Sequence, residues 1–287
     1  MSKVELINRR TWKNPLERRY YRAIHGYIDQ GEEKAFDLAL AAASGARVLD
    51  IGVGAGRTAE LLAPRSRSYV GIDYTREMID LSHRLLPELR FEVMDARNLA
   101  AFEDASFDLV VFSYNGIDSV EGEGRLQVLN EVARVLRPGG CFVFSTFNRG
   151  WNGFGTSRFS PRVTWTADPV RLAYRLTMRS MGWFRQHWYR RYEIQGEHNV
   201  ILHHAHHFGI MVYATTPAQL RRQLTHAGFE ARFDLFSPQG EMLDFGGETC
   251  DVEYFHVLAV RGHDQESENR HSSAPRKLDL LSSADPI

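Results

Sequence analysis

RVLDIGVGAGRTAELLA, from Arg47 to Ala63, is the stretch that decides the fold. Its first part, from Val48 to Val53, is apolar except for Asp50, which is typical of a buried strand. Three glycines then alternate along the chain, at Gly52, Gly54 and Gly56. Glycine lets a backbone turn sharply and approach a ligand closely, and the residues that follow suit a helix. A strand, a glycine turn and a helix in this order predict a cofactor site.

A carboxylate follows this turn at an informative distance. Asp73 ends the next apolar run, YVGID, about 20 residues after the turn, where nucleotide-binding α/β folds place an acceptor for both ribose hydroxyls. Arg57 stands where the dinucleotide pattern G-x-G-x-x-G needs its third glycine. The sequence therefore favours a nucleoside cofactor that carries a small zwitterion in place of phosphates. A nicotinamide dehydrogenase is a remote alternative.

Later segments extend the pattern. FEVMDARNL puts Asp95 at the end of a third apolar run, and SFDLVVFSYNGID ends a fourth at Ser113, Tyr114 and Asn115. LNEVARVLRPGGCFVFSTFN predicts an amphipathic helix, a Pro-Gly-Gly turn and a fifth strand. With D-x-G-x-G-x-G after the first strand and L-R-P-G-G before the fifth, the chain resembles the class I S-adenosylmethionine-dependent methyltransferases. The resemblance covers residues 47–148 and resumes at TTPAQLRRQLTHAGFEARFDLF, which is similar to the family's late helix, Ala-Gly-Phe turn and sixth strand.

The resemblance implies a fold, a cofactor and its ligands. The fold is α/β, a doubly wound, mostly parallel seven-stranded sheet with N-terminal helices and a helical, aromatic insert after the fifth strand. The cofactor is S-adenosyl-L-methionine. The family pattern assigns its methionine part to Asp50, Gly52 and Gly54, its ribose hydroxyls to Asp73, its adenine to Tyr74, Met78, Asp95 and Ala96, and its sulfonium to Ser113 and Tyr114. Alternatives remain at three positions: Asp50 could only anchor the loop, Met78 could be helix core, and Tyr114 could pack without touching the ligand.

The composition narrows the class of protein. With 287 residues, a net charge of −1 and a pI near 6.9, the chain suits one catalytic α/β domain and has no global attraction to nucleic acid or membranes. Two cysteines provide no disulfide framework, and no apolar run approaches the roughly 18 residues of a membrane span. The start, MSKVELINRRTW, lacks the apolar region of a signal peptide. We therefore expect a cytoplasmic protein. The sequence carries no signal for oligomeric state.

The pattern divides the chain into five parts. We expect an N-terminal helical lid at 1–44, a cofactor-binding core at 45–148, an insert that forms a substrate lid at 149–205, the completion of the core sheet at 206–261 and a disordered tail at 262–287. In the N-terminal part a helix is predicted to begin near Pro15, before a second, alanine-rich helix. Its tyrosines, Tyr20, Tyr21 and Tyr27, either reach the site or only dock the helix.

The insert has a composition of its own. Trp151 to Tyr192 holds eight arginines, one acid and four of the chain's five tryptophans. Asp168 and Pro169 predict a helix start, after which arginines repeat every four residues along one face and Val170, Ala173, Leu176 and Met181 mark the opposite face. One interpretation is a lid whose apolar stripe packs on the core while its arginines are solvated. The others are recognition of an anionic small substrate, docking on RNA, and contact with a membrane surface.

Six of the twelve histidines lie between positions 187 and 207, and HHAHH precedes the apolar run FGIMVY. If this region is one strand, His204 and His206 project to one face and His203 and His207 to the other. No HExxH or CxxC motif accompanies them, so we predict no metal site. The candidates to orient or deprotonate an acceptor are His207, His206 and Tyr21.

The absence of two subclass signatures shapes the functional prediction. The fourth strand ends in SYNGID instead of the Asn/Asp-Pro-Pro-aromatic tetrapeptide of base-amino methyltransferases, and there is no Pro-Cys nucleophile. We therefore expect methyl transfer to a nitrogen or oxygen of a small molecule, an anionic one if the arginines of the insert bind it. The alternatives are an RNA nucleoside methyltransferase that uses the basic insert, and a non-catalytic protein that binds S-adenosylmethionine or S-adenosylhomocysteine.

Overall fold

The computed structural model describes most of the chain, namely residues 2–15, 27–43, 45–155, 160, 162, 164–196, 199–244 and 251–263. The predicted helix that begins near Pro15 falls largely outside these ranges, together with Tyr20 and Tyr21. The tail beyond residue 263, for which we predicted disorder, lies outside them as well.

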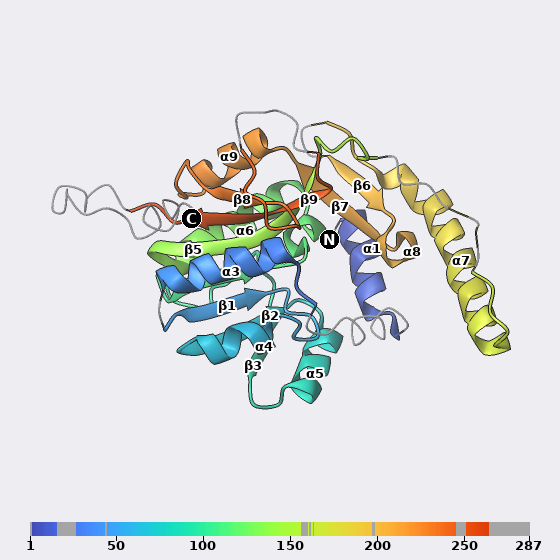
Figure 1. Ribbon diagram of the computed structural model, residues 1–287, viewed down its shortest axis with the longest axis horizontal. Helices are drawn as coiled ribbons and strands as arrows, with labels where there is room; N and C mark the ends of the chain where they lie inside the picture. Colours follow the sequence, from blue (N-terminus) through green and yellow to red (C-terminus); the bar gives the residue numbers. More distant parts are fainter. Residues whose placement is uncertain are drawn as a thin grey trace, which may run out of the picture.

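A mixed β-sheet forms the centre of the molecule (Figure 1). Its main strands are β1 (Arg47–Ile51), β2 (Ser68–Asp73), β3 (Arg90–Val93), β4 (Phe107–Phe112), β5 (Leu136–Asn148), β8 (Asp234–Phe236) and β9 (Tyr254–Val260). They lie in the order β3-β2-β1-β4-β5-β9-β8, and β9 runs in the direction opposite to the other six. The predicted mostly parallel α/β sheet is confirmed, although the whole sheet has nine strands instead of seven.

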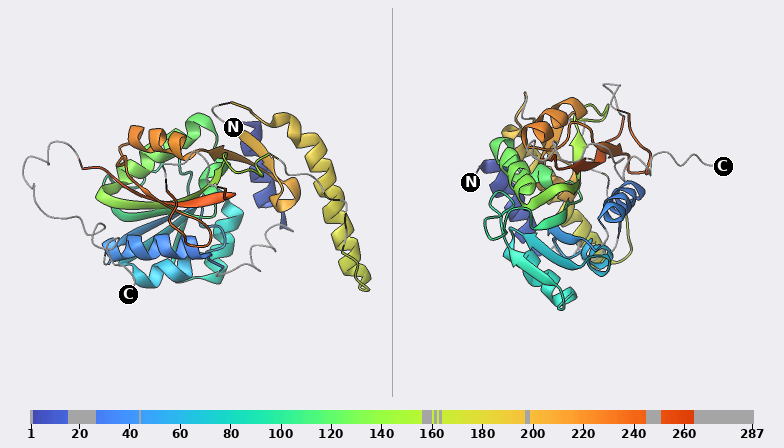
Figure 2. Two further views of the ribbon diagram at one scale, coloured as in Figure 1. Left: turned by 45° about the horizontal axis from the view of Figure 1, so that its top comes forward. Right: turned by 90° about the vertical axis from the view of Figure 1, so that its left-hand side faces the viewer.

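Helices cover both faces of this sheet (Figure 2). The helices of the core are α3 (Gln30–Ala42), α4 (Ala59–Leu62), α5 (Arg76–Leu85), α6 (Gly122–Val135) and α9 (Pro217–His226). One hydrophobic cluster joins Phe36 of α3 and Leu62 of α4 to the sheet, and the other joins Val128 of α6 and Leu220 of α9 to the opposite face. Because both faces are covered, the central strands are apolar along nearly their whole length.

Two further strands extend the sheet, one at the end of the predicted insert and one in the apolar run FGIMVY. β7 (Ile210–Thr215) pairs in parallel with the end of β5, and β6 (Val200–His203) pairs antiparallel with β7. A short turn, α8 (Ala205–Phe208), reverses the chain between them, and His206 and His207 both have a φ of +52° there. The prediction that the histidines alternate along one strand is therefore wrong, because left-handed residues turn the backbone at their centre.

The helix α1 (Lys3–Lys13) lies beside β7. The Asn8 side chain accepts a hydrogen bond from the Met211 amide (2.8 Å) and donates one to the Met211 carbonyl (2.9 Å). Both backbone groups of a buried strand residue are thereby satisfied by one amide side chain. This helix is separate from the one predicted to begin near Pro15, and it fixes the N-terminus to the two added strands.

The helix α7 (Pro169–Tyr189) extends away from the body of the protein (Figure 2). Asp168 caps it by accepting from the Val170 and Arg171 amides, as predicted. The interpretation in which the apolar stripe packs on the core is wrong, since Val170 is 76% and Leu176 48% exposed. Among the described residues, no helix combines the length and apolar character needed to cross a membrane.

A buried ion pair lies where β5 meets β7. Asp118, in the short helix η2 (Gly116–Ser119), accepts from Arg125 Nη1 (2.7 Å), the Thr146 hydroxyl (2.7 Å) and the Phe147 amide (2.7 Å). The side chains of Asp118 and Arg125 are fully buried, and the guanidinium lies 4.8 Å from the centre of the Tyr213 ring. The pair therefore connects η2, α6, β5 and β7.

Replacing Arg125 by Leu is expected to lower the free energy of unfolding by about 3–5 kcal/mol, because Asp118 would be left buried without its counterion. Urea unfolding followed by circular dichroism measures the change. The control is Arg90→Leu, which breaks an exposed ion pair with Glu92 and is expected to change stability by about 0.5 kcal/mol or less. Equal effects of the two substitutions would contradict this role.

Candidate functional site

A cavity of about 980 Å³ opens at the carboxyl ends of β1, β2, β4 and β5. Ligands of open α/β sheets bind at this edge. Nine of the ten residues predicted to bind the cofactor line this cavity, namely Gly52, Gly54, Asp73, Tyr74, Met78, Asp95, Ala96, Ser113 and Tyr114. His206 and His207 line it too, whereas Tyr21 lies outside the described residues.

The glycine turn after β1 forms one wall of the cavity. Gly52 and Gly54 have φ angles of +66° and +57°, in the region that favours glycine. A Cβ atom on Gly52 would lie 2.7 Å from the Phe112 ring, so a side chain is excluded there by space as well as by conformation. The turn therefore presents bare backbone to the cavity, as the sequence predicted.

Asp73 lies at the end of β2 with its carboxylate held by the backbone. It accepts from the Gly54 amide (3.2 Å) and the Thr75 amide (2.7 Å), and the residue is 8% exposed. Burial raises the pKa of Asp73 to about 6, although the two amide hydrogen bonds act in the opposite direction. A carboxylate has room for further hydrogen bonds, so Asp73 can accept from hydroxyl groups of a ligand in the cavity.

Asp50 differs from the other predicted ligands because it does not line the cavity. It is fully buried beneath the glycine turn, where it accepts from the hydroxyls of Thr58 (2.5 Å) and Tyr69 (2.7 Å). The predicted contact of Asp50 with a ligand is thus corrected in favour of the alternative, in which Asp50 anchors the loop. The reason is geometric: its side chain points to the α4 side of the strand.

Arg57 is a site residue that the sequence reasoning missed. Its guanidinium pairs with both oxygens of Glu32 (2.7 and 2.6 Å), donates to the Ser113 hydroxyl (2.9 Å) and lines the cavity. In the sequence, Arg57 was informative only as the residue that replaces the third glycine of the dinucleotide pattern. The available signal was a cation beside the turn, but its partner Glu32 belongs to α3 and no local spacing connects the two.

Comparison with known proteins identifies the core. Residues 48–140 match the family model described as a methyltransferase domain. The chain is 37% identical over 110 residues to a demethylmenaquinone methyltransferase of Beutenbergia cavernae, covering 38% of this chain and 44% of that protein. It is 39% identical over 106 residues to a fatty-acid O-methyltransferase of Mycolicibacterium smegmatis, covering 35% and 37%. This chain carries a class I S-adenosylmethionine-dependent methyltransferase domain.

The fold comparison extends over more of the methyltransferase. A solved S-adenosylmethionine-dependent methyltransferase from Clostridium acetobutylicum superposes with a TM-score of 0.56, at 13% identity, over 86% of this chain and 97% of the other. At this identity the likeness concerns the fold alone. In sequence, the chain spans less than half the length of the two curated relatives named above.

The cavity fits S-adenosylmethionine, the cofactor of this domain. Its volume is at the upper end of the range of about 300–1,000 Å³ for ligand sites, which leaves room for a second molecule. Asp73 offers a buried acceptor for ribose hydroxyls, and the backbone of the glycine turn lies open beside it. Arg57, paired with Glu32, lines the same wall, and Tyr74 and Met78 add apolar surface for a base.

Asp95 of the methyltransferase domain is already engaged in an ion pair. It accepts from the backbone amide of Arg97 (3.0 Å) and from its guanidinium, which also binds Glu5 of α1 (2.8 Å). Burial acts to raise the pKa of Asp95, but the hydrogen bonds from Arg97 outweigh it and the pKa is lowered. Asp95 stays an ionised acceptor at the cavity wall, and its contact with adenine stays a prediction.

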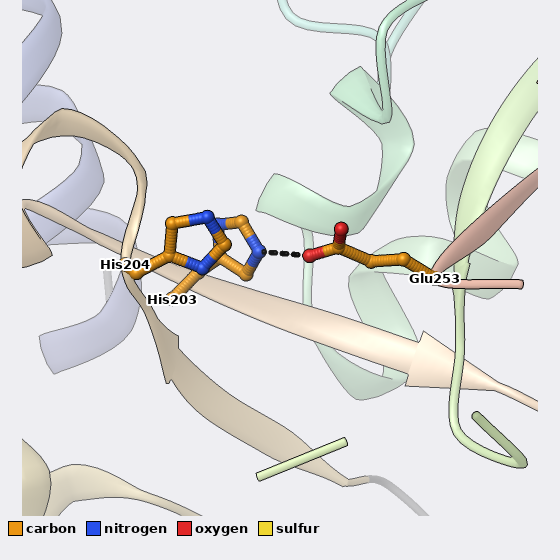
Figure 3. A group of neighbouring side chains, drawn as sticks. All are labelled: His203, His204 and Glu253. Atoms are coloured by element: carbon orange, nitrogen blue, oxygen red, sulfur yellow. Dashed lines mark hydrogen bonds and ion pairs between the residues drawn. The ribbon is translucent and has the colours of Figure 1, made fainter. Parts of the chain in front are cut away.

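A second group of residues, His203, His204 and Glu253, lines the same cavity. Figure 3 shows these three side chains together. His203, at the end of β6, donates from Nε2 to Glu253 (3.2 Å) and accepts at Nδ1 from the Ala205 amide (3.2 Å). The His204 ring lies 4.2 Å from that of His203, between centroids. The hydrogen bond from His203 lowers the pKa of Glu253, and burial lowers the pKa of His204. His204 is therefore a neutral imidazole near pH 7.

These three residues also have the donor types of a metal site. Ligand atoms of His203, His204 and Glu253 lie within 4.8 Å of one another. Both ring nitrogens of His203, however, already have protein partners, so a metal ion would have to displace one of them. The arrangement as it stands suits proton transfer better than metal binding, and our expectation of no metal stays a prediction.

We expect the affinity for S-adenosylhomocysteine to rise with pH through about 6 and to level off above it, because Asp73 accepts fully from the ribose hydroxyls only when ionised. Asp73→Asn should bind about 100-fold more weakly at pH 8 and lose this dependence. Isothermal titration calorimetry between pH 5 and 8 measures both.

Asp50→Asn is the matched control, since burial raises the pKa of Asp50 to about 6 as well. Its carboxyl does not line the cavity, so the pH dependence of binding should persist in this variant. A dependence that vanishes in Asp50→Asn but persists in Asp73→Asn would contradict the ribose assignment.

Proposed function

We propose that this protein transfers the methyl group of S-adenosylmethionine to a nitrogen or oxygen atom of a small molecule, with His204 as the proton acceptor. The observation that carries the proposal is the continuity of one cavity. The residues suited to the cofactor and the group of His203, His204 and Glu253 line the same cavity. A cofactor and an acceptor can therefore meet in one shared space.

Bound S-adenosylmethionine supplies an activated methyl group. The chain's own task is to hold the acceptor atom in line with it and to remove the acceptor's proton where there is one. As a bond forms between the acceptor atom and the methyl carbon, the acceptor's N–H or O–H bond breaks and its proton passes to the neutral imidazole of His204. The carbon–sulfur bond breaks in the same displacement.

Glu253 and His203 position this base. Glu253 accepts a hydrogen bond from Nε2 of His203, and the Ala205 amide donates one to Nδ1. The His203 ring is therefore fixed in one orientation and one tautomer. Its ring lies against that of His204 and limits how the second imidazole can turn. Glu253 also places a negative charge near the imidazolium that forms on His204.

The names of the relatives support a small-molecule acceptor. The two described above are named for demethylmenaquinone and for a fatty acid, both of which are lipids. The lining supports it as well, since Phe147, Ile210 and Val212 add apolar surface beside the histidines. We infer a lipophilic acceptor that carries one hydroxyl or amine. His206 and His207 line the same region and are tested beside His204.

The experiment is incubation of the enzyme and isotope-labelled S-adenosylmethionine with a lipid extract and, separately, with total RNA. Mass spectrometry then locates the label. Label in a lipid hydroxyl or amine is the expected result. Label in RNA, or cofactor binding without any labelled product, would overturn the proposal in favour of the two alternatives from the sequence.

With the labelled acceptor, His204→Asn is expected to lower kcat by about 100-fold or more, since general bases contribute roughly 10²–10⁴. In the wild type, kcat should rise with pH through the lowered pKa of His204, because only the neutral ring accepts a proton. This rise should disappear in the variant. The control is His226→Asn, an exposed position outside the cavity.

The affinity for S-adenosylhomocysteine should remain unchanged in His204→Asn, which separates a role in proton transfer from a folding defect. The same assay on His206→Asn and His207→Ala ranks the three histidines. A kcat and pH profile equal to those of the wild type in His204→Asn would remove His204 from the mechanism.

A further inference from the structure

The outward face of α7 is the largest feature that the proposed function leaves unexplained. Met178 and Gly182 are its buried residues, and Tyr174 and Met178 line the cavity mouth. Tyr174, Met178 and Gly182 follow one another at four-residue spacing and mark the inner face of the helix. The helix thus has one face toward the cavity, and the large side chains of its opposite face are exposed, with Arg191 stacked on the Trp188 ring (4.0 Å).

That opposite face is apolar and aromatic. Its large exposed side chains are Val170 (76%), Leu176 (48%), Trp183 (57%), Phe184 (57%) and Trp188 (46%). Two stacked ring pairs run along the helix, Trp183 with His187 and Phe184 with Trp188. Soluble monomers rarely leave such a continuous apolar row exposed without a partner for it.

Arginines stand beside this row, except for Arg185, which faces inward and donates to the His206 carbonyl. The segment from Asp168 to Glu193 contains arginines at 171, 175, 179, 185, 190 and 191. Its acidic residues are Asp168 and Glu193. Asp168 and Glu193 stand at the ends, where they pair with Arg171 and Arg190. The whole chain has a net charge of only −1, so the positive charge is local to this helix.

We propose that the outward face of α7 docks on an anionic lipid bilayer. A helix with tryptophan, phenylalanine and leucine on one face and arginines along its flanks lies in the plane of a membrane interface. The arginines pair with lipid phosphates while the aromatic rings enter the boundary of the acyl chains. The positive charge of these arginines complements the negative charge of the lipid headgroups, which favours a bilayer as the partner of this face.

A second copy of the chain is a poorer occupant for the same surface. Pairing two α7 helices through their apolar rows would bring the remaining arginines of both copies together, with acids only at the helix ends. Like charges placed opposite one another in an interface disfavour the complex. A bilayer rich in anionic lipid offers the apolar depth and the negative charge together.

The docked orientation has a consequence for the cavity. Because Tyr174 and Met178 on the inner face line the cavity mouth, the helix would separate the membrane from that mouth by its own width. An acceptor dissolved in the lipid would then reach the cavity along α7. This last step rests on the proposed function, whereas docking itself does not.

The test is flotation of the full chain with vesicles of phosphatidylcholine alone or with phosphatidylglycerol added, together with tryptophan fluorescence. We expect binding that requires phosphatidylglycerol, weakens with salt and shifts the tryptophan emission to shorter wavelength. The variant Trp183→Ser/Phe184→Ser/Trp188→Ser should bind about tenfold more weakly or worse. None of these three residues lines the cavity.

The matched control is Met242→Ser/Val93→Ser, which removes exposed apolar side chains elsewhere (56% and 40%) and should bind vesicles like the wild type. An unchanged affinity for S-adenosylhomocysteine shows that the α7 variant is folded. The proposal is overturned if the wild type does not bind the anionic vesicles, or if sedimentation shows a dimer that the α7 variant alone abolishes. Vesicle binding without any methyl transfer to lipid would support docking and count against the proposed acceptor.

Discussion

The buried pair of Asp118 and Arg125 is the interaction on which the two halves of the site depend. The sheet divides at the end of β5, whose first part pairs with β9 and whose last residues also pair with β7. Asp118 binds the amide of Phe147 at that division, and Arg125 stacks on Tyr213 of β7. The turn that follows β4, with Ser113 and Tyr114, leads directly into η2 and so into Asp118. One ion pair therefore fixes the cofactor side relative to the acceptor side, and several hydrogen bonds compensate for the cost of its burial.

The cofactor side was largely predictable because its signals are local. A turn with φ near +60° at alternate positions needs glycine, and a carboxylate at the end of the next strand needs only the regular spacing of a βαβ unit. Asp50 shows the limit of this reasoning. Its position in the motif was right, but whether its side chain faces the cavity or the helix beneath depends on which face of β1 it occupies.

The acceptor side depends on contacts between residues far apart in the chain. Glu253 forms a hydrogen bond with His203, which lies 50 positions earlier in the chain. Arg57, in the glycine turn, pairs with Glu32 of α3. Neither pairing can be inferred from the local periodicity of the sequence. The same holds for α7: its sequence shows that an apolar stripe exists, but only tertiary packing decides which face is covered. The chain buries the narrow row of Met178 and Gly182 and leaves the broad aromatic row outside.

The turn at His206 and His207 connects the group of His203, His204 and Glu253 with the helix α7. His206, His207 and Phe208 all have φ between +52° and +57°, a conformation that costs roughly 1–3 kcal/mol for each such residue. Contacts on both sides compensate for that cost. Trp12 of α1 packs against the His206 ring, with 4.9 Å between ring centroids. Arg185 of α7 donates to the His206 carbonyl (2.8 Å).

Gly209 has no side chain where Arg185 passes, and a Cβ there would lie 2.6 Å from its guanidinium. The contact that holds the turn thus comes from the inner side of the helix whose outer side carries the aromatic row. Arg185 thus connects α7 to the backbone of His206, a few residues from His203 and His204. The position of these histidines therefore depends on a contact with α7, although no residue of α7 belongs to the histidine group itself.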